Sequence, residues 1–242
     1  MLDISKIRAI TLDLDDTLWP IWPTIERAEN ALAAWLSQQA PLAAGVFADR
    51  KARLALRDHV VRTCPDLGHD MSALRRESIR LALHQSGEDT QLAQAAFEVF
   101  FAERMRVDLF ADAIPALEFL AQRFPIVALS NGNADVGRVG IGAHFHASVS
   151  AHEFGVGKPD PRIFHAAANA AGVNAHEVLH IGDDAALDVL GALDAGMQTA
   201  WVNRDQQVWA HAAQPHLIVT ELGQLCRLFG PPQLPGHPDE AK

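Results

Sequence analysis

The spacing of apolar residues changes twice along the chain, and these changes restrict the possible folds more than any other feature. Residues 8–14 (RAITLDL) form a short, apolar run that is typical of a buried parallel strand. From about residue 24 to residue 107 the apolar residues recur with helical spacing, and after residue 109 strand-like and helix-like runs alternate. This order predicts a sheet domain that is interrupted by a block of helices.

The alternating part predicts an α/β fold with a doubly wound, Rossmann-like parallel sheet. After the first strand we expect strands at 126–129, 147–150, 178–181, 199–202 and 217–219, and helices at 112–123, 161–171 and 186–195. The helical block contains four periodic segments, at roughly 24–39, 43–63, 72–86 and 89–107. Because this block follows the first strand directly, it is best interpreted as an inserted helical-bundle cap.

These patterns predict a division of the chain into three parts. Residues 1–20 and 108–230 are expected to form the core, and residues 21–107 the cap. The last residues, 231–242 (PPQLPGHPDEAK), are polar and rich in proline, which predicts disorder.

The composition excludes several classes of partner. The formal net charge is −10, which disfavours nucleic acids and anionic membranes because both need a basic patch. No apolar run reaches the roughly 18 residues that a membrane span requires, and the first ten residues lack a signal-peptide pattern. The two cysteines, Cys64 and Cys226, lie far apart and in no metal-ligand spacing. We therefore expect a cytoplasmic protein. Its oligomeric state is left open by the sequence.

Polar residues follow three of the expected strands, at the points where those strands end. They are DLDDT at 13–17, SNG at 130–132 and GDD at 182–184, and a further polar segment, KPDP at 158–161, precedes a helix. In open α/β sheets, ligands bind beyond the carboxyl ends of the strands. These four segments are therefore expected to meet at one edge of the sheet.

The acidic residues of these segments indicate a metal-assisted reaction. Asp13 and Asp15 are expected on the same side of their strand, where one carboxylate can attack while the other transfers protons. Asp183, with Asp184 or Asp188, adds negative charge to the same place. Two unit charges ~4 Å apart repel by ~4 kcal/mol at an effective dielectric of ~20. A divalent cation would offset this repulsion, and oxygen ligands favour Mg²⁺.

Lys158 is one of four lysines and lies in the segment GVGKPDP rather than on a helix face. Beside an acidic cluster, its ammonium can hold both a nucleophilic aspartate and a phosphate. The Ser130 hydroxyl and nearby backbone amides would complete a cradle for an anion.

The four segments resemble the four motifs of the haloacid dehalogenase (HAD) superfamily, in the same order and with similar spacing. The stretch 127–204 is most similar to phosphatases of flavin mononucleotide (FMN) and of ribitylaminouracil phosphate. The resemblance implies a phosphatase that needs Mg²⁺ and hydrolyses a small phosphorylated metabolite through an aspartyl-phosphate.

The resemblance also implies a role for each matching residue. Asp13 would be the nucleophile and Asp15 the acid and base, with Lys158 as the third catalytic residue. Phosphate would be bound by Thr17, Ser130, Asn131 and Lys158. The metal would be held by Asp13, by the backbone carbonyl of Asp15 and by Asp183, with support from Asp188 and, less directly, Asp184.

Substrate contacts in the cap are harder to predict. The segment 68–78 (GHDMSALRRES) offers His69, Arg75 and Arg76 as candidates, although Asp70 or Ser72 in the same segment can simply cap a helix. Trp22 lies where the chain enters the cap and is a fourth candidate. The pairs His144 with His146 and His176 with His180 lack a third metal ligand, so they are interpreted as surface or core histidines.

Three other functions share parts of this pattern. A haloacid dehalogenase uses the same nucleophilic aspartate but needs no acid two residues later, so Asp15 favours phosphoryl chemistry. A phosphomutase passes its phosphate to a sugar instead of to water. A protein without activity could bind a phosphorylated ligand, although the intact set of Asp13, Asp15, Lys158 and Asp183 argues against this.

Overall fold

β1 (Ala9–Leu12) lies at the centre of a six-stranded parallel sheet with the strand order β3-β2-β1-β4-β5-β6. The computed structural model describes residues 1–230. The other strands are β2 (Ile126–Ser130), β3 (Ala147–Ser150), β4 (Val178–Gly182), β5 (Gln198–Val202) and β6 (Leu217–Val219). All are close to their predicted positions, which confirms the α/β class of the fold. The predicted disorder of residues 231–242 lies outside the described residues.

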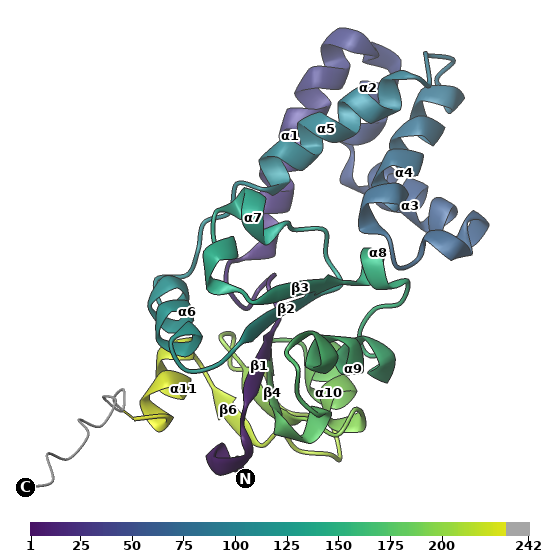
Figure 1. Cartoon of the computed structure of the whole chain (residues 1–242). Coiled ribbons are helices and arrows are strands. Elements are labelled where there is room, and N and C mark those ends of the chain that lie inside the picture. Colours follow the sequence, from purple (N-terminus) through teal and green to yellow (C-terminus); the bar gives the residue numbers. More distant parts are fainter. Residues whose placement is uncertain (231–242) are drawn as a thin grey trace, which may run out of the picture.

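The two faces of the sheet are covered by different helices (Figure 1). Side chains alternate along a strand, so Ile10 and Leu12 point to one face, where α6 (Ala113–Ala121) and α11 (Leu222–Leu228) pack. Ala9 points to the opposite face, which is covered by α9 (Pro161–Ala170) and α10 (Gly191–Asp194). Two apolar clusters therefore enclose the sheet.

The strand order makes the carboxyl end of β1 a topological switch point. The chain proceeds from β1 to β2 and β3 on one side, and to β4, β5 and β6 on the other. Ligands bind at such a switch point in open α/β sheets, since the connections on the two sides diverge and leave a crevice.

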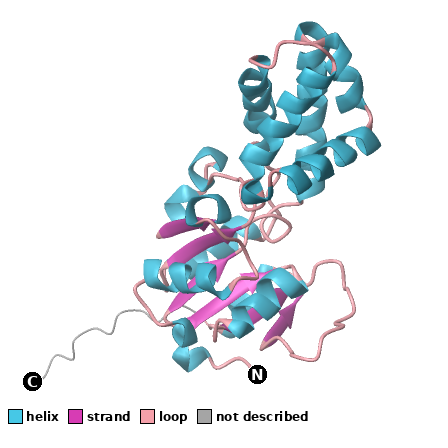
Figure 2. Cartoon of the chain, turned by 90° about the vertical axis from the view of Figure 1, so that its right-hand side faces the viewer, coloured by secondary structure: helices cyan, strands magenta, loops and turns pink. Residues whose placement is uncertain are grey.

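The cap consists of the helices that follow β1 and lie beyond one end of the sheet (Figures 1 and 2). They are α1 (Ile21–Gln39), α2 (Pro41–Ala48), α3 (Arg50–Thr63), α4 (Met71–Gln85) and α5 (Leu92–Arg104). Their inward faces form a third apolar cluster, which includes Leu32, Leu36, Ile79, Phe97 and Phe100 and shares no member with the clusters of the sheet. The cap therefore has a hydrophobic core of its own.

The expectation of a single helix at 43–63 is wrong, because two helices occupy this segment. Asp49 separates them with extended backbone, and its carboxylate accepts a hydrogen bond from the Lys51 amide at 2.8 Å. An aspartate that satisfies a free amide at the first turn starts a new helix. The apolar spacing continues through this break, which is why periodicity alone missed it.

Among the described residues, none of the helices combines the length and the apolar character needed to cross a lipid bilayer.

Candidate active site

The turn after β1 is held in place by its own polar groups. The Asp13 amide donates to the Ile181 carbonyl at 2.9 Å, so the ladder between β1 and β4 extends to Asp13. Asp16 has a φ of 57°, in the left-handed region that aspartate tolerates better than most residues. Its carboxylate accepts from the Ile21 amide at 2.9 Å, where α1 begins. This turn therefore connects the end of the strand to the start of the cap.

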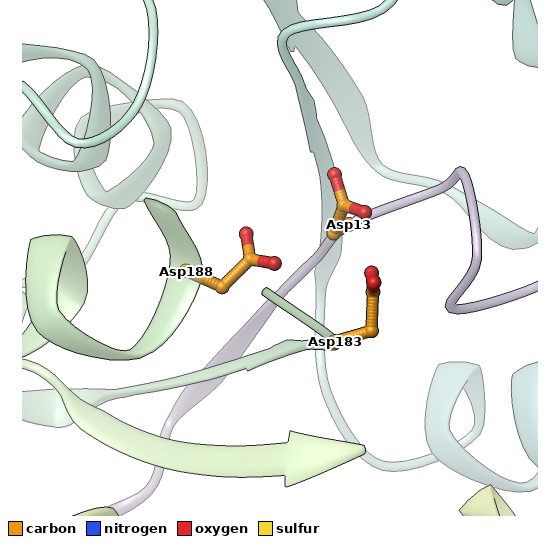
Figure 3. Close-up of side chains that lie close together, drawn as sticks. All are labelled: Asp13, Asp183 and Asp188. Atoms are coloured by element: carbon orange, nitrogen blue, oxygen red, sulfur yellow. The ribbon is translucent and has the colours of Figure 1, made fainter. Parts of the chain in front are cut away.

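Three carboxylates meet at the end of β1. One oxygen of each of Asp13, Asp183 and Asp188 lies within 4.8 Å of one from each of the others, and the three side chains point toward a common centre (Figure 3). Asp13 follows β1, Asp183 follows β4, and Asp188 lies in η5 (Ala185–Leu190), a π-helical turn. Residues that are distant in sequence thus form one acidic cluster, as the carboxyl ends of parallel strands predict.

Burial makes two members of this cluster, Asp13 and Asp183, hard to ionise by themselves. Burial raises the pKa of Asp13 well above its ordinary value, and Asp188 and Asp183 add to the effect while Lys158 opposes it. Burial and the charge of Asp188 also raise the pKa of Asp183 to about 7. Crowded oxygen ligands that resist ionisation fit a divalent cation, which would favour their charged forms.

Lys158 connects two of these carboxylates from a buried position. Its ammonium contacts Asp13 Oδ1 and lies 2.6 Å from Asp188 Oδ1. Burial alone would lower the pKa of Lys158, but the charges of Asp13 and Asp188 raise it. Burial acts against the charge of Asp188 as well, yet Lys158 and His180 lower its pKa. Lys158 and Asp188 therefore form a charged pair beside Asp13.

The backbone around Lys158 is fixed by the side chain of Asn131. The Lys158 amide donates to Asn131 Oδ1 at 2.7 Å, and Asn131 Nδ2 donates to the Lys158 carbonyl at 2.8 Å. Gly157 makes this approach possible, because a Cβ at that position would lie 2.6 Å from Asn131 Oδ1. Asn131, predicted to bind phosphate, is thus occupied in holding the lysine loop.

The other predicted core residues lie around the cluster in different ways. Ser130 is buried, and its hydroxyl accepts from the Gly132 amide at 2.9 Å. The Thr17 hydroxyl, predicted to bind phosphate, donates to Asp183 Oδ1 at 3.0 Å. The Asp184 carboxylate accepts from the amides of Ala186 and Leu187, so it caps η5 instead of joining the cluster.

Asp15 lies apart from the cluster, since β1 ends before it and strand alternation does not reach it. Its Oδ1 accepts from Trp19 Nε1 at 2.8 Å, and both of its oxygens accept from Arg104 Nη2 at 2.7 Å. Sequence reasoning missed Arg104. It stands two residues before Arg106 in the run AERMRV, and no local signal separates a buried arginine from an exposed one there.

His180 is a second residue whose role the sequence did not reveal. It is buried in β4, its Nε2 lies 3.1 Å from Asp188 Oδ1, and its Nδ1 lies 2.8 Å from the Thr11 hydroxyl. Thr11 and His180 are register partners on neighbouring strands. The sequence offered one signal for this contact, since Thr11 and His180 are polar residues within two buried strands that lie side by side. His180 is thus a core histidine, as predicted, but one that contacts the site.

The cap candidates differ in where the structure places them. His69 lines a cleft of about 580 Å³ that Lys158 and Asn131 also line. The Arg75 guanidinium pairs with Glu29 at 2.7 Å and lies over the Phe100 ring, while that of Arg76 lies over Phe97. Trp22 is 68% exposed and has Arg50 over its ring at 6.0 Å. Only His69 is therefore brought beside the lysine loop.

Two polar contacts connect the start of α4 with the core. Asp70 caps α4 through the Ala73 amide, and its Oδ2 lies 2.9 Å from His152 Nδ1. Ser72, the other predicted capping residue, accepts from Asn133 Nδ2 at 3.2 Å. The cap segment that carries His69 thus contacts the core next to the cleft.

Comparison with known proteins identifies the family. The model for haloacid dehalogenase-like hydrolases matches residues 7–196, and the chain belongs to this family. The 5-amino-6-(5-phospho-D-ribitylamino)uracil phosphatase YigB of Escherichia coli is 33% identical over 234 residues, which cover 93% of this chain and 98% of YigB. The phosphoserine phosphatase of Thermus thermophilus is 31% identical over 251 residues, covering 90% of this chain and 98% of that enzyme.

A solved structure, the 2-haloacid dehalogenase from Pseudomonas syringae pv. Tomato DC3000, is 38% identical with a TM-score of 0.87, and the match covers 92% of this chain and 98% of that one. The chain is therefore an enzyme of a family that includes phosphatases and dehalogenases. The named phosphatases among its relatives support the predicted phosphatase activity.

Proposed function

We propose that the protein is a Mg²⁺-dependent phosphatase that hydrolyses small phosphate monoesters through an aspartyl-phosphate on Asp13. The observation that carries this proposal is the buried cluster of Asp13, Asp183 and Asp188 with Lys158 beside the nucleophile. The carboxylates suit a cation and the lysine suits an anion. A phosphate monoester with its metal satisfies both.

The donor set fits Mg²⁺, which prefers oxygen ligands. Asp13, Asp183 and the backbone carbonyl of Asp15 would hold the ion, and Asp188 offers a further carboxylate at the same centre. When bound, the ion supplies positive charge that offsets the carboxylates and the phosphate.

The side chains then divide the reaction between them. A carboxylate oxygen of Asp13 attacks phosphorus, while the bond from phosphorus to the ester oxygen breaks and Asp15 gives its proton to that oxygen. Lys158 stabilises the negative charge that develops on the phosphoryl oxygens. Asp15 next takes a proton from water, whose oxygen attacks phosphorus, and the bond to Asp13 breaks. Phosphate is released and both aspartates return to their starting states.

The cleft and the relatives support a small metabolite as the substrate class. The cleft of about 580 Å³ between His69 and Lys158 has the volume of a site for a small metabolite. Identity to YigB supports testing ribitylaminouracil phosphate and FMN first, and identity to the Thermus enzyme adds phosphoserine. The half-buried free thiols of Cys64 and Cys226 are compatible with the cytoplasmic location that we retain in this proposal.

A haloacid dehalogenase is the second candidate, since a structure of that description is 38% identical to this chain. Displacement of a halide needs no proton for the leaving group, and it brings no phosphate charge that a cation must offset. Asp15 and the acidic cluster would be superfluous in that reaction. Measuring both phosphate release and halide release over one panel of substrates separates the two functions, and phosphate release also separates hydrolysis from phosphomutase activity or mere binding.

The decisive variant is Asp13→Asn, which keeps the shape of the side chain but removes the nucleophilic oxygen. We expect phosphate release to fall to background while thermal unfolding shows a folded protein. Asp49→Asn is the matched control, because it makes the same change at the remote cap of α3, where asparagine also caps well. Near-normal turnover by Asp13→Asn would refute the covalent mechanism.

A further inference from the structure

Arg104 is a buried charge at the boundary between the cap and the core. It is the last residue of α5, and only 1% of it is exposed. Its Nη2 donates to both carboxylate oxygens of Asp15 at 2.7 Å. Trp19, which precedes α1, donates to Asp15 Oδ1 at 2.8 Å. Asp15 is therefore held by one residue shortly before the first cap helix and by one at the end of the last cap helix.

We propose that Arg104 is a positioning residue that orients the Asp15 carboxylate for proton transfer and makes this orientation depend on the cap. The proposal rests on the phosphatase function proposed above. The single Nη2 between the two oxygens restricts rotation of the carboxylate. The backbone of Gly132 lies close to this pair, since a Cβ there would lie 2.5 Å from Asp15 Oδ2 and 3.5 Å from Arg104 Nη2.

The energetics of Arg104 favour a functional role. Burying a charge is costly unless it is well paired, and an apolar side chain of similar volume often stabilises a protein as much as a buried ion pair does. Among residues 1–230, Asp15 is the acidic partner of Arg104, and Arg104 Nη1 is buried without a hydrogen-bond acceptor. If Arg104 only filled space, an apolar side chain could replace it, and no contact with Asp15, the proposed acid, would be needed.

The location of Arg104 gives the cap a way to influence the chemistry. Cap helix α5 ends at Arg104, so a displacement of α5 moves the guanidinium relative to Asp15, which belongs to the core. The Asp15 carboxylate is therefore well oriented only when the cap is packed against the core. Water is excluded from the cleft in the same arrangement.

The test compares two phosphate monoesters that differ in their need for a proton donor. An alkyl phosphate releases an alkoxide that must be protonated, whereas p-nitrophenyl phosphate releases a phenolate that departs without a proton. General acid catalysis contributes roughly 10²–10⁴-fold to a rate. In Arg104→Met we expect kcat/KM, which covers the steps up to departure of the leaving group, to fall by about 10²-fold for the alkyl ester and by less than about threefold for the aryl ester. Hydrolysis of the aspartyl-phosphate also uses Asp15 and is common to both esters, so kcat/KM rather than kcat is compared.

Four further variants make the result specific. Arg104→Lys keeps a charge and should recover part of the alkyl activity, and it carries the test if Arg104→Met does not fold. Trp19→Phe removes the other donor and should give a smaller loss of the same kind. Adding Arg104→Met to Asp15→Asn should cause no further loss, because the two residues act as one unit. Arg106→Gln is the control on the exposed side of the same chain segment and should leave both activities unchanged.

Equal losses of kcat/KM on the two esters, or unchanged kcat/KM on both, would overturn the role of Arg104. Additional loss in the double variant would do the same, since it would show that Arg104 acts independently of Asp15. A wild-type enzyme that releases no phosphate from either ester would instead refute the phosphatase function itself. The two failures are therefore distinguishable.

Discussion

Beneath the acidic cluster, single side chains form a chain of polar contacts into the sheet. Thr11 contacts His180, His180 contacts Asp188, and Asp188 shares the Lys158 ammonium with Asp13. Each group is buried, so each depends on its neighbour for a hydrogen bond that water cannot supply. His180 thereby fixes Asp188, which in turn fixes Lys158 beside Asp13.

Replacing His180 should expose this dependence. His180→Leu leaves the Thr11 hydroxyl without its nitrogen partner and removes one contact of Asp188, which keeps Lys158 and the Asp184 amide. An unsatisfied buried group costs about 1–3 kcal/mol. We expect that loss in urea unfolding, together with reduced kcat because Asp188 is less well oriented. His176→Leu is the control at an exposed position, where a change within about 0.5 kcal/mol is expected. Equal stabilities of the two variants would contradict the structural role of His180.

His180 should also make the stability of the folded protein depend on pH, and the direction of the shift in its pKa decides the direction of this dependence. Burial lowers the pKa of His180 below its ordinary value of 6.5, so the folded state holds this histidine neutral while the unfolded state takes up a proton. Its contribution to stability is therefore present above pH 6.5 and is lost as the pH falls below it. We expect the stability difference between wild type and His180→Leu to shrink on acidification, as unfolding curves at pH 7.5 and 5.5 would show.

At the scale of helices and loops, replacement by alanine should have opposite effects at two glycines, Gly157 and Gly45. Gly157→Ala places a methyl group 2.6 Å from Asn131 Oδ1, so the loop must move away from the residue that holds Lys158. We expect a loss of phosphatase activity. Gly45→Ala lies within α2, where a Cβ has no atom within 4 Å, and it should raise stability by roughly 0.5–1 kcal/mol without affecting turnover. Activity assays and thermal unfolding of both variants check the pair.

Elements were predictable from the sequence where a local pattern determines them. Strands such as β3 and β6 match their predicted residues because short apolar runs in an α/β chain have few alternatives. The convergence of Asp13, Lys158 and Asp183 followed from the topology. Arg104 and the detailed contacts of Thr17 and Asn131 did not, because their partners are distant in sequence and side-chain rotamers decide the contacts.

At the scale of the whole molecule, the cluster connects segments from both halves of the sheet, so a bound cation should affect global stability. Burial raises the pKa of Asp183 to about 7 from its ordinary value of 3.8. Between these values the folded state without metal holds a proton that the unfolded state lacks, so this contribution to stability is lost as the pH rises through the window. In the proposed metal site, Mg²⁺ would compete with that proton.

Stabilisation by Mg²⁺ should therefore be larger at pH 8 than at pH 6 at the same total concentration. A ligand at 100 times its Kd adds about 2.7 kcal/mol to the free energy of unfolding. Thermal unfolding with and without Mg²⁺ at both pH values measures this difference without any substrate. Asp183→Asn should diminish the shift at both pH values. An equal shift at both pH values in the wild type would contradict the proposed ligand role of Asp183.

Separate apolar interiors for the cap and for the sheet have a practical consequence for protein engineering. We expect that the helical segment 21–103 can be repacked or exchanged with that of a relative without disturbing the apolar core of the sheet, because among residues 1–230 no buried apolar residue belongs to both cores. Libraries for new substrates can thus be confined to one insert. Such a graft should keep an arginine at the position of Arg104, since the transplanted helices would otherwise lack the ion pair with Asp15, the proposed proton donor.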